Sequence, residues 1–191
     1  MMKKSLLLLA ALVLGGCATH WPESALLNPQ VIPSNQQYYS GNRITMEGVD
    51  KREAAYVFSI KKKEKAPVLV NSSQPLNNLL AEKLAEGLRS QGLEVGNSGT
   101  TNLTLAISTA AVTVEEKTFT YVTKSRVSLQ VIADFQGSKL TKQFNMSSSK
   151  EEPGEPTMAD LESTLNQQLG SVLQQIMADE ALRGYLKGQP S

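Results

Sequence analysis

The chain has very little of the chemistry that enzyme sites use. Its 191 residues include one cysteine and one histidine, Cys17 and His20, which lie close together near the start. An intramolecular disulfide needs a second cysteine, and structural zinc sites need several Cys or His ligands. Catalytic arrangements that depend on histidine are excluded from the rest of the chain. We therefore expect a fold held by its core, with no cofactor and no metal.

Carboxylate pairs do occur, but each consists of sequence neighbours. They are Glu115–Glu116, Glu151–Glu152 and Asp179–Glu180, which fall in predicted turns or at helix starts. General acid–base catalysis needs carboxyl groups that face each other across a substrate, and solvated neighbours rarely do so. A Ser–Lys dyad stays open because both residue types are plentiful. We expect the protein not to be an enzyme.

The net charge is close to zero. The chain has 19 basic and 18 acidic residues, a net charge of +1. Without residues 1–16, which include Lys3 and Lys4, 17 basic residues would face 18 acidic ones, a net charge of −1. Nucleic-acid-binding domains carry a basic face. We expect no nucleic-acid partner.

Long apolar runs are missing as well. The longest, Leu6–Leu14, contains only Leu, Ala and Val. It is far shorter than the ~18–20 residues that a membrane-spanning helix needs. Lys3 and Lys4 precede it, and Gly15 and Gly16 follow it. This order is typical of a secretory signal peptide.

The stretch Leu14-Gly15-Gly16-Cys17 resembles the bacterial lipoprotein signal. The resemblance implies cleavage between Gly16 and Cys17, and a Cys17 that carries diacylglycerol and an acyl chain. Several chains hold a protein firmly on a membrane, whereas one does not. Ala18 stands where Asp retains lipoproteins in the inner membrane, which implies the outer membrane and a periplasm-facing protein. The alternative is a secretory signal followed by an incidental free cysteine.

Composition divides the rest of the chain. Residues 1–16 form the expected signal peptide. Residues 17–42 are rich in Pro, Asn, Gln and Ser, and we expect them to form the lipidated N-terminus and a flexible tether. Residues 43–188 form one periplasmic domain, and residues 189–191 a frayed tail. Trp21 suits the headgroup layer, or merely follows the anchor.

Three short strands are expected first, at residues 43–49, 55–60 and 67–70. Between the second and third lies the run Lys61-Lys62-Lys63-Glu64-Lys65. The run can be a patch for anionic lipid or glycan. A solvated turn is the simpler interpretation, because no aromatic residue is interleaved.

Two amphipathic helices are expected. One begins after a Ser cap at residues 72–73 and ends at Gly92. The second begins at a capping box formed by Thr157 and Asp160 and continues to about residue 178. A short helix over 179–186 follows.

The clearest strand pattern is an antiparallel meander. It has strands at 103–114, 119–135 and 140–146, with a bulge near 108–110, and a polar loop over 147–156. We predict an α+β fold in two layers: an antiparallel meander, within a sheet that can be mixed, and two amphipathic helices packed on its one dry face.

Several segments together resemble the YajG-type lipoproteins of Gram-negative bacteria, an uncharacterised family. They are Cys17, residues 67–96, residues 102–146 and the helix TLNQQLGSVLQQIMAD. The resemblance implies a periplasm-facing outer-membrane lipoprotein and carries over no catalytic residue.

Two functions remain. The first is a non-catalytic binding or accessory module that docks on an envelope protein or on peptidoglycan. The alternative is a small-ligand or lipid carrier with a pocket between helices and sheet. A carrier needs an apolar cavity of several hundred Å³ there, whereas an accessory module is solidly packed.

The distal part of the first hairpin, residues 111–123, is the expected partner surface. Its candidate contacts are Val112, Val114, Phe119, Tyr121 and Val122. The hairpin is long enough to extend past the helices, so these side chains would be exposed, and its edges could accept a partner strand or a second copy. The alternative is that the tether or the 147–156 loop covers them.

Overall fold

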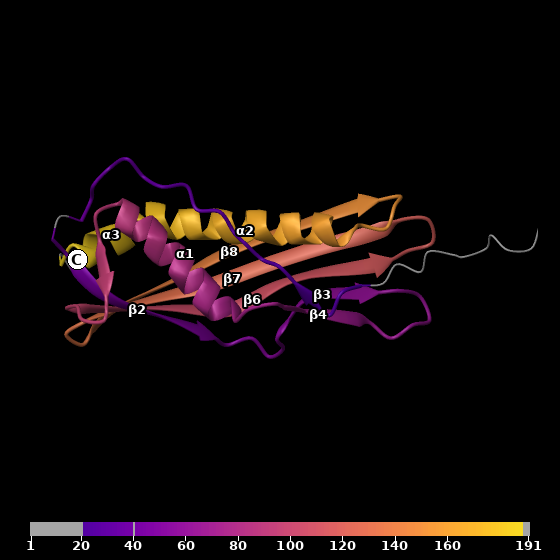
Figure 1. Ribbon diagram of the computed structural model, residues 1–191, viewed down its shortest axis with the longest axis horizontal. Helices are drawn as coiled ribbons and strands as arrows, with labels where there is room; N and C mark the ends of the chain where they lie inside the picture. The colour runs from indigo at the N-terminus through magenta and orange to yellow at the C-terminus, as the bar shows by residue number, and fades with distance from the viewer. Residues whose placement is uncertain (1–20, 40, 189–191) are drawn as a thin grey trace, which may run out of the picture.

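A computed structural model describes residues 21–39 and 41–188 of the chain. The predicted lipidation and cleavage residues, Cys17 and Gly16, therefore lie outside the described residues, as does the 189–191 tail. The fold is α+β, with three helices and a curled, mixed sheet of eight strands (Figure 1). The elements are β1 (Ser24–Ala25), β2 (Arg43–Asp50), β3 (Tyr56–Lys61), β4 (Val68–Ser72), α1 (Leu76–Ser90), β5 (Glu94–Gly96), β6 (Thr101–Glu116), β7 (Tyr121–Phe135), β8 (Ser138–Glu152), α2 (Met158–Ala178) and α3 (Glu180–Leu186).

Strand β6 is the centre of the sheet. On one edge it pairs antiparallel with β7 along its whole length. On the other edge β2 pairs parallel with residues 101–107, and β3 pairs parallel with residues 112–115. The two short strands thus share one edge end to end, and a shift of register between Ile107 and Thr109 confirms the predicted bulge. The predicted meander is therefore part of a larger mixed sheet.

Strand β8 is longer than predicted. It continues to Glu152, so the irregular segment begins only at residue 153 instead of 147. Its second edge has no partner among the described strands. A strand at the edge of a sheet tolerates polar residues and lysines, which also deter pairing with other chains. The Ser- and Lys-rich composition therefore does not mark a loop here.

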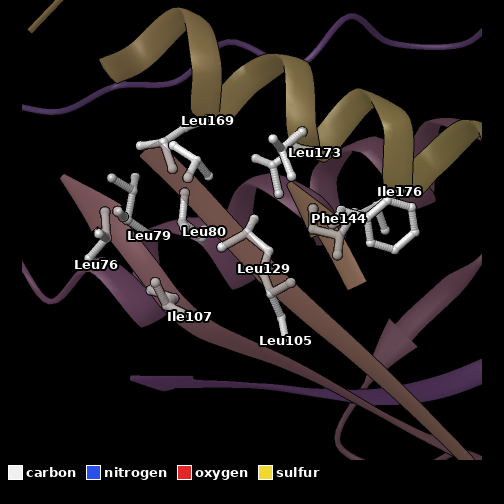
Figure 2. Packing of buried hydrophobic residues seen from close by; sticks show 14 of the residues in the cluster. Leu76, Leu79, Leu80, Leu105, Ile107, Leu129, Phe144, Leu169, Leu173 and Ile176 are labelled. Carbon is white, nitrogen blue, oxygen red and sulfur yellow. The ribbon is translucent and has the colours of Figure 1, made fainter. Parts of the chain in front are cut away.

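Helices α1 and α2 cover one face of the sheet, as predicted. Figure 2 shows Leu169, Leu173 and Ile176 of α2 directed at the sheet, where Leu105 and Leu129 lie. The predicted capping box at Thr157 is present. Helix α1 differs from expectation, because its N-cap is Pro75 and no side chain caps it.

Residues 21–39, which belong to the expected flexible tether, instead pack against the domain. Alternate side chains point inward in one stretch, and these are apolar: Ala25, Leu27, Pro29 and Val31. The alternation is hard to see in the sequence because the outward positions include Leu26 and Ile32, which are 70% and 71% exposed. Trp21 is buried as well. We call residues 21–39 the strap.

Side chains of α2 bind the backbone of the strap at regular intervals. The amide of Leu26 donates to Glu162 (2.9 Å), that of Asn28 to Asn166 (2.8 Å) and that of Ile32 to Gln174 (3.2 Å). Two residues of extended chain advance ~6.6 Å and four residues of helix ~6 Å, so the two repeats nearly match. This match holds the strap parallel to the helix axis.

The position of α2 between Asn166 and Gln174 must be a small residue. A Cβ on Gly170 would lie 2.5 Å from the carbonyl oxygen of Gln30. The Gly170→Ala variant should therefore displace the strap and lower stability by about 1–3 kcal/mol. Amide hydrogen exchange over residues 26–32 and chemical denaturation measure the two effects.

Gly184 in α3 provides the matched control, because nothing lies within 4 Å of an added Cβ. Gly184→Ala should leave the strap unchanged and stabilise α3 by up to about 1 kcal/mol through helix propensity. Equal exchange in the strap of both variants would show that the strap does not depend on this contact.

Candidate functional site

The structure corrects the predicted partner surface. Val112 and Val114 are fully buried, so the prediction that they are exposed was wrong. Helix α2 reaches farther than expected: Gln168 donates a hydrogen bond to Ser125, the β7 residue directly opposite Val112. The helix begins ten residues before Gln168, which adds about 15 Å of cover toward the hairpin turn.

The other three predicted contact residues differ in their exposure. Phe119, in the turn between β6 and β7, is 87% exposed, whereas Tyr121 and Val122 are half-buried. The edges of this hairpin are also occupied, because β3 and β2 pair with β6 and β8 pairs with β7. The structure therefore does not support strand addition at the hairpin edges, and of the five candidates only Phe119 remains fully exposed.

Three adjoining hollows lie on the face of the sheet that the helices leave uncovered. Their volumes are about 400, 310 and 610 Å³, and all three share Thr109 at the bulge of β6. We call this surface the bulge groove. Its principal residues are Tyr56, Lys61, Thr109, Ala111, Lys124 and Arg126.

The groove is hollow because its floor is made of small side chains. On the outer face, Ala111 of β6 lies beside Arg126 of β7, and Arg126 lies beside Ser147 of β8. The next row consists of Thr109, Ser128 and Asn145. Short side chains on β6 beside long ones on β7 leave a depression with hydroxyl, amide and cationic groups around it.

The groove is positively charged. The three hollows are lined by five cationic side chains (Lys51, Arg52, Lys61, Lys124, Arg126) and two carboxylates (Glu53, Glu115). The Glu115 carboxylate accepts a hydrogen bond from Lys117, which with the nearby Lys124 lowers its pKa. Arg126 is exposed and makes no ion pair with any described residue. The groove therefore offers cationic groups to an anionic ligand.

Arg52 holds the crossover between β2 and β3 in place at one end of the groove. Its Nε and Nη2 donate to the Asp50 carboxylate at 2.9 and 2.8 Å, and its Nη1 to the carbonyls of Tyr56 and Ala110 at 3.3 and 3.4 Å. The side chain is only 7% exposed. The hydrogen bonds from Arg52 lower the pKa of Asp50 in spite of its partial burial. Arg52 thus shapes the groove, whereas Arg126 has no ion pair with a described residue and the exposed Lys124 has only a 3.7 Å contact with the Glu115 carboxylate.

The sequence analysis missed this site. The alternation of polar residues along 124–130 marks an exposed face, but only the parallel pairing of β3 with β6 places Tyr56 and Lys61 beside it. That pairing joins segments more than 50 residues apart, so no local sequence pattern predicts it.

The described residues contain no group of three or more His, Cys, Asp or Glu side chains suited to a metal ion. Among the helices that the structure describes, none combines the length and the apolar character needed to cross a bilayer.

Comparison with known proteins identifies the family. A family model described as "Uncharacterized lipoprotein" matches residues 29–187. No curated protein matches the sequence. Among solved structures, a protein from Xanthomonas campestris described with the family DUF330 is 9% identical, with a TM-score of 0.65, and the match covers 88% of this chain and 99% of that one. At this identity the similarity shows the fold alone.

Two lipoproteins of known structure match with lower scores. One, from Neisseria meningitidis, is 9% identical with a TM-score of 0.37, and the match covers 72% of this chain and 99% of that one. The other, rare lipoprotein B from Shewanella oneidensis, is 11% identical with a TM-score of 0.36, and the match covers 72% and 95%.

Replacing Arg52 by Ala should destabilise the domain by about 1–3 kcal/mol, because a nearly buried donor to one carboxylate and two carbonyls is lost. Arg43→Ala is the matched control: its pair with Glu94 is more than half exposed on both sides, so the cost should stay below about 1 kcal/mol. Chemical denaturation at neutral pH measures both. Equal losses would show that Arg52 does not organise the crossover.

The contact between Arg52 and Asp50 also predicts how the stability of the domain depends on pH in acid. The pKa of Asp50 is lower in the folded protein than its ordinary value, so its contribution is complete above the unfolded pKa of about 3.9 and is lost as the pH falls through the folded pKa. The stability difference between the parent and Asp50→Asn should shrink below about pH 4. A difference that stays constant into acid would contradict this assignment.

Proposed function

Since the chain belongs to a family of uncharacterized lipoproteins, we propose that it is a non-catalytic binding module of the cell envelope. Membership implies a lipid-anchored envelope protein. The proposal adds that Cys17 carries the lipid, that cleavage occurs after Gly16, and that Ala18 directs the protein to the outer membrane, facing the periplasm. It also includes the narrower assignment to the YajG-type lipoproteins.

The ligand that the bulge groove fits best is peptidoglycan. One observation carries this proposal: five cationic side chains line the groove against two carboxylates, and Arg126 among them has no ion pair with a described residue. Peptidoglycan offers sugar hydroxyls and amides to Ser and Thr side chains, and peptide carboxylates to Lys124 and Arg126. Charge-assisted hydrogen bonds of this kind are among the stronger polar contacts.

A folded protein partner suits the groove less well. The cores of protein interfaces are depleted in Lys and Ser, and both residue types line this surface, as Lys61, Lys124 and Ser147 illustrate. A hydrated polymer that carries carboxylates matches such a surface without the need to bury it completely.

The carrier alternative finds less support in the packing. Buried side chains of α1, α2 and the sheet form one continuous cluster, which includes Leu80, Leu105, Leu129, Leu169 and Leu173, each at most 1% exposed. A lipid carrier needs an apolar cavity at this interface. The three hollows of the bulge groove lie on the opposite face, and the hollow of about 590 Å³ beside the start of α2 is lined mainly by polar residues such as Ser148, Lys150 and Asp160.

The anchor is tested by Cys17→Ser. The parent protein should float with outer-membrane vesicles and yield an N-terminal peptide with an acylated Cys17, whereas the variant should be released into the soluble periplasmic fraction. Density-gradient fractionation and mass spectrometry measure these outcomes. An unmodified Cys17 in the parent protein would remove the anchor from the account.

The groove is tested by binding to purified peptidoglycan sacculi. Arg126→Gln and Lys124→Gln should each weaken binding by about tenfold, which corresponds to ~1.4 kcal/mol, and binding should fall as salt rises. Lys139→Gln is the matched control, because it removes an exposed lysine of β8 at the other end of the sheet. Unchanged binding in the groove variants, or an equal loss in the control, would refute the proposal.

A further inference from the structure

Three loops meet at one end of the sheet. Lys62 Nζ lies 2.7 Å from a carboxylate oxygen of Glu155, which joins the β3–β4 loop to the β8–α2 loop. The amide of Lys63 donates to Glu116 at 3.0 Å, which joins the first loop to the β6–β7 turn. We call this end the tip; it comprises residues 61–69, 116–121 and 152–157. In Figure 1 it lies at the right, opposite α3.

The described chain starts beside the tip. Strand β1 runs parallel to β4, with Ser24 opposite Asn71, and the Asn71 amide donates to the Glu23 carbonyl at 3.3 Å. Traced back from Ser24, the chain therefore runs along β4 toward Val68, the first residue after the β3–β4 loop. Trp21 is buried at this place, only 8% exposed.

The distance from the proposed lipid on Cys17 to the buried Trp21 is short. Cys17 precedes Trp21 by four residues, and four residues span at most ~14 Å. If Cys17 is lipidated, as the proposed function holds, Trp21 and the loops beside it lie at the membrane surface. A flexible tether of 25 residues would have imposed no such restriction.

The tip has the surface that a bilayer interface requires. Five large apolar side chains are exposed in the described part of the chain, and three of them are in the tip: Phe119 (87%), Leu69 (53%) and Val68 (37%). Three lysines are exposed beside them, Lys61 at the end of β3 and Lys63 and Lys65 in the β3–β4 loop, and they outnumber the one exposed carboxylate of this run, Glu64. Apolar side chains that enter the headgroup–acyl boundary, next to lysines that meet anionic headgroups, are typical of interfacial membrane binding.

We propose that the tip rests on the phospholipid surface to which the protein is anchored, with Phe119 and Leu69 in the headgroup–acyl boundary. The lysine run then contacts anionic headgroups, one of the two interpretations that its sequence allows. The proposal rests on the lipidation of Cys17. It adds that the domain has a fixed orientation on the membrane, in which the long axis of the sheet points away from the bilayer.

The test uses a fluorescent label at Phe119→Cys. The full lipidated protein is reconstituted into vesicles of phosphatidylethanolamine and phosphatidylglycerol, where the acylated Cys17 leaves the new thiol as the only free one. An environment-sensitive label at this position should lose its quenching by aqueous iodide and become quenched by spin-labelled lipid. Ser138→Cys, at the start of β8 and at the opposite end of the sheet, is the matched control and should remain quenched by iodide alone.

The outcomes separate the two proposals. Protein that does not float with the vesicles contradicts the lipid anchor. Protein that floats while the label at position 119 is as accessible to iodide as the label at 138 refutes the tip contact and leaves the anchor intact. Protection at 119 that requires an added envelope protein extract, and is missing in pure vesicles, assigns the tip to a protein partner and likewise overturns the proposal.

Discussion

The arrangement of the sheet depends on the hydrogen-bonding needs of the backbone of strand β6. Its 16 residues are flanked by neighbours on both edges, and a buried strand needs hydrogen-bond partners along its length. Strand β7 satisfies one edge completely. On the other edge neither β2 nor β3 is long enough to pair with all of β6, so the two strands follow one another and leave a gap between them. At this gap β6 bulges, and Arg52 donates a hydrogen bond to its backbone. The bulge groove is the outer surface of that junction.

Local patterns predicted most elements correctly, because they depend on near neighbours. The bulge near 108–110, the capping box at Thr157 and the helix end at Gly92 all follow from side-chain spacing or backbone freedom within a few residues. The errors arose from contacts between distant segments. Val112 is buried because α2 extends over it, and the strap is ordered because residues of α2 bind its amides. The groove likewise joins β3 to β6 and β7.

The strap changes what a lipid anchor can do. A long flexible tether would let the domain sample any orientation, whereas a chain fixed from Trp21 onward allows the lipid little freedom relative to the fold. The strap runs from the tip along α2 to Tyr39, which is buried, and the amides of Tyr38 and Tyr39 donate to the Gln91 carbonyl. In the proposed orientation the groove, on the helix-free face, stays accessible except at Lys61, which belongs to the tip as well.

The central claim is that this face binds peptidoglycan in the cell, and site-specific photo-crosslinking tests it most directly. A photoreactive amino acid at Ser147, beside Arg126 in the groove, should attach the protein to material that only muramidase digestion releases. The same amino acid at Glu82, exposed on α1, should not. Attachment to murein from Glu82 but not from Ser147, or from neither, would contradict the account.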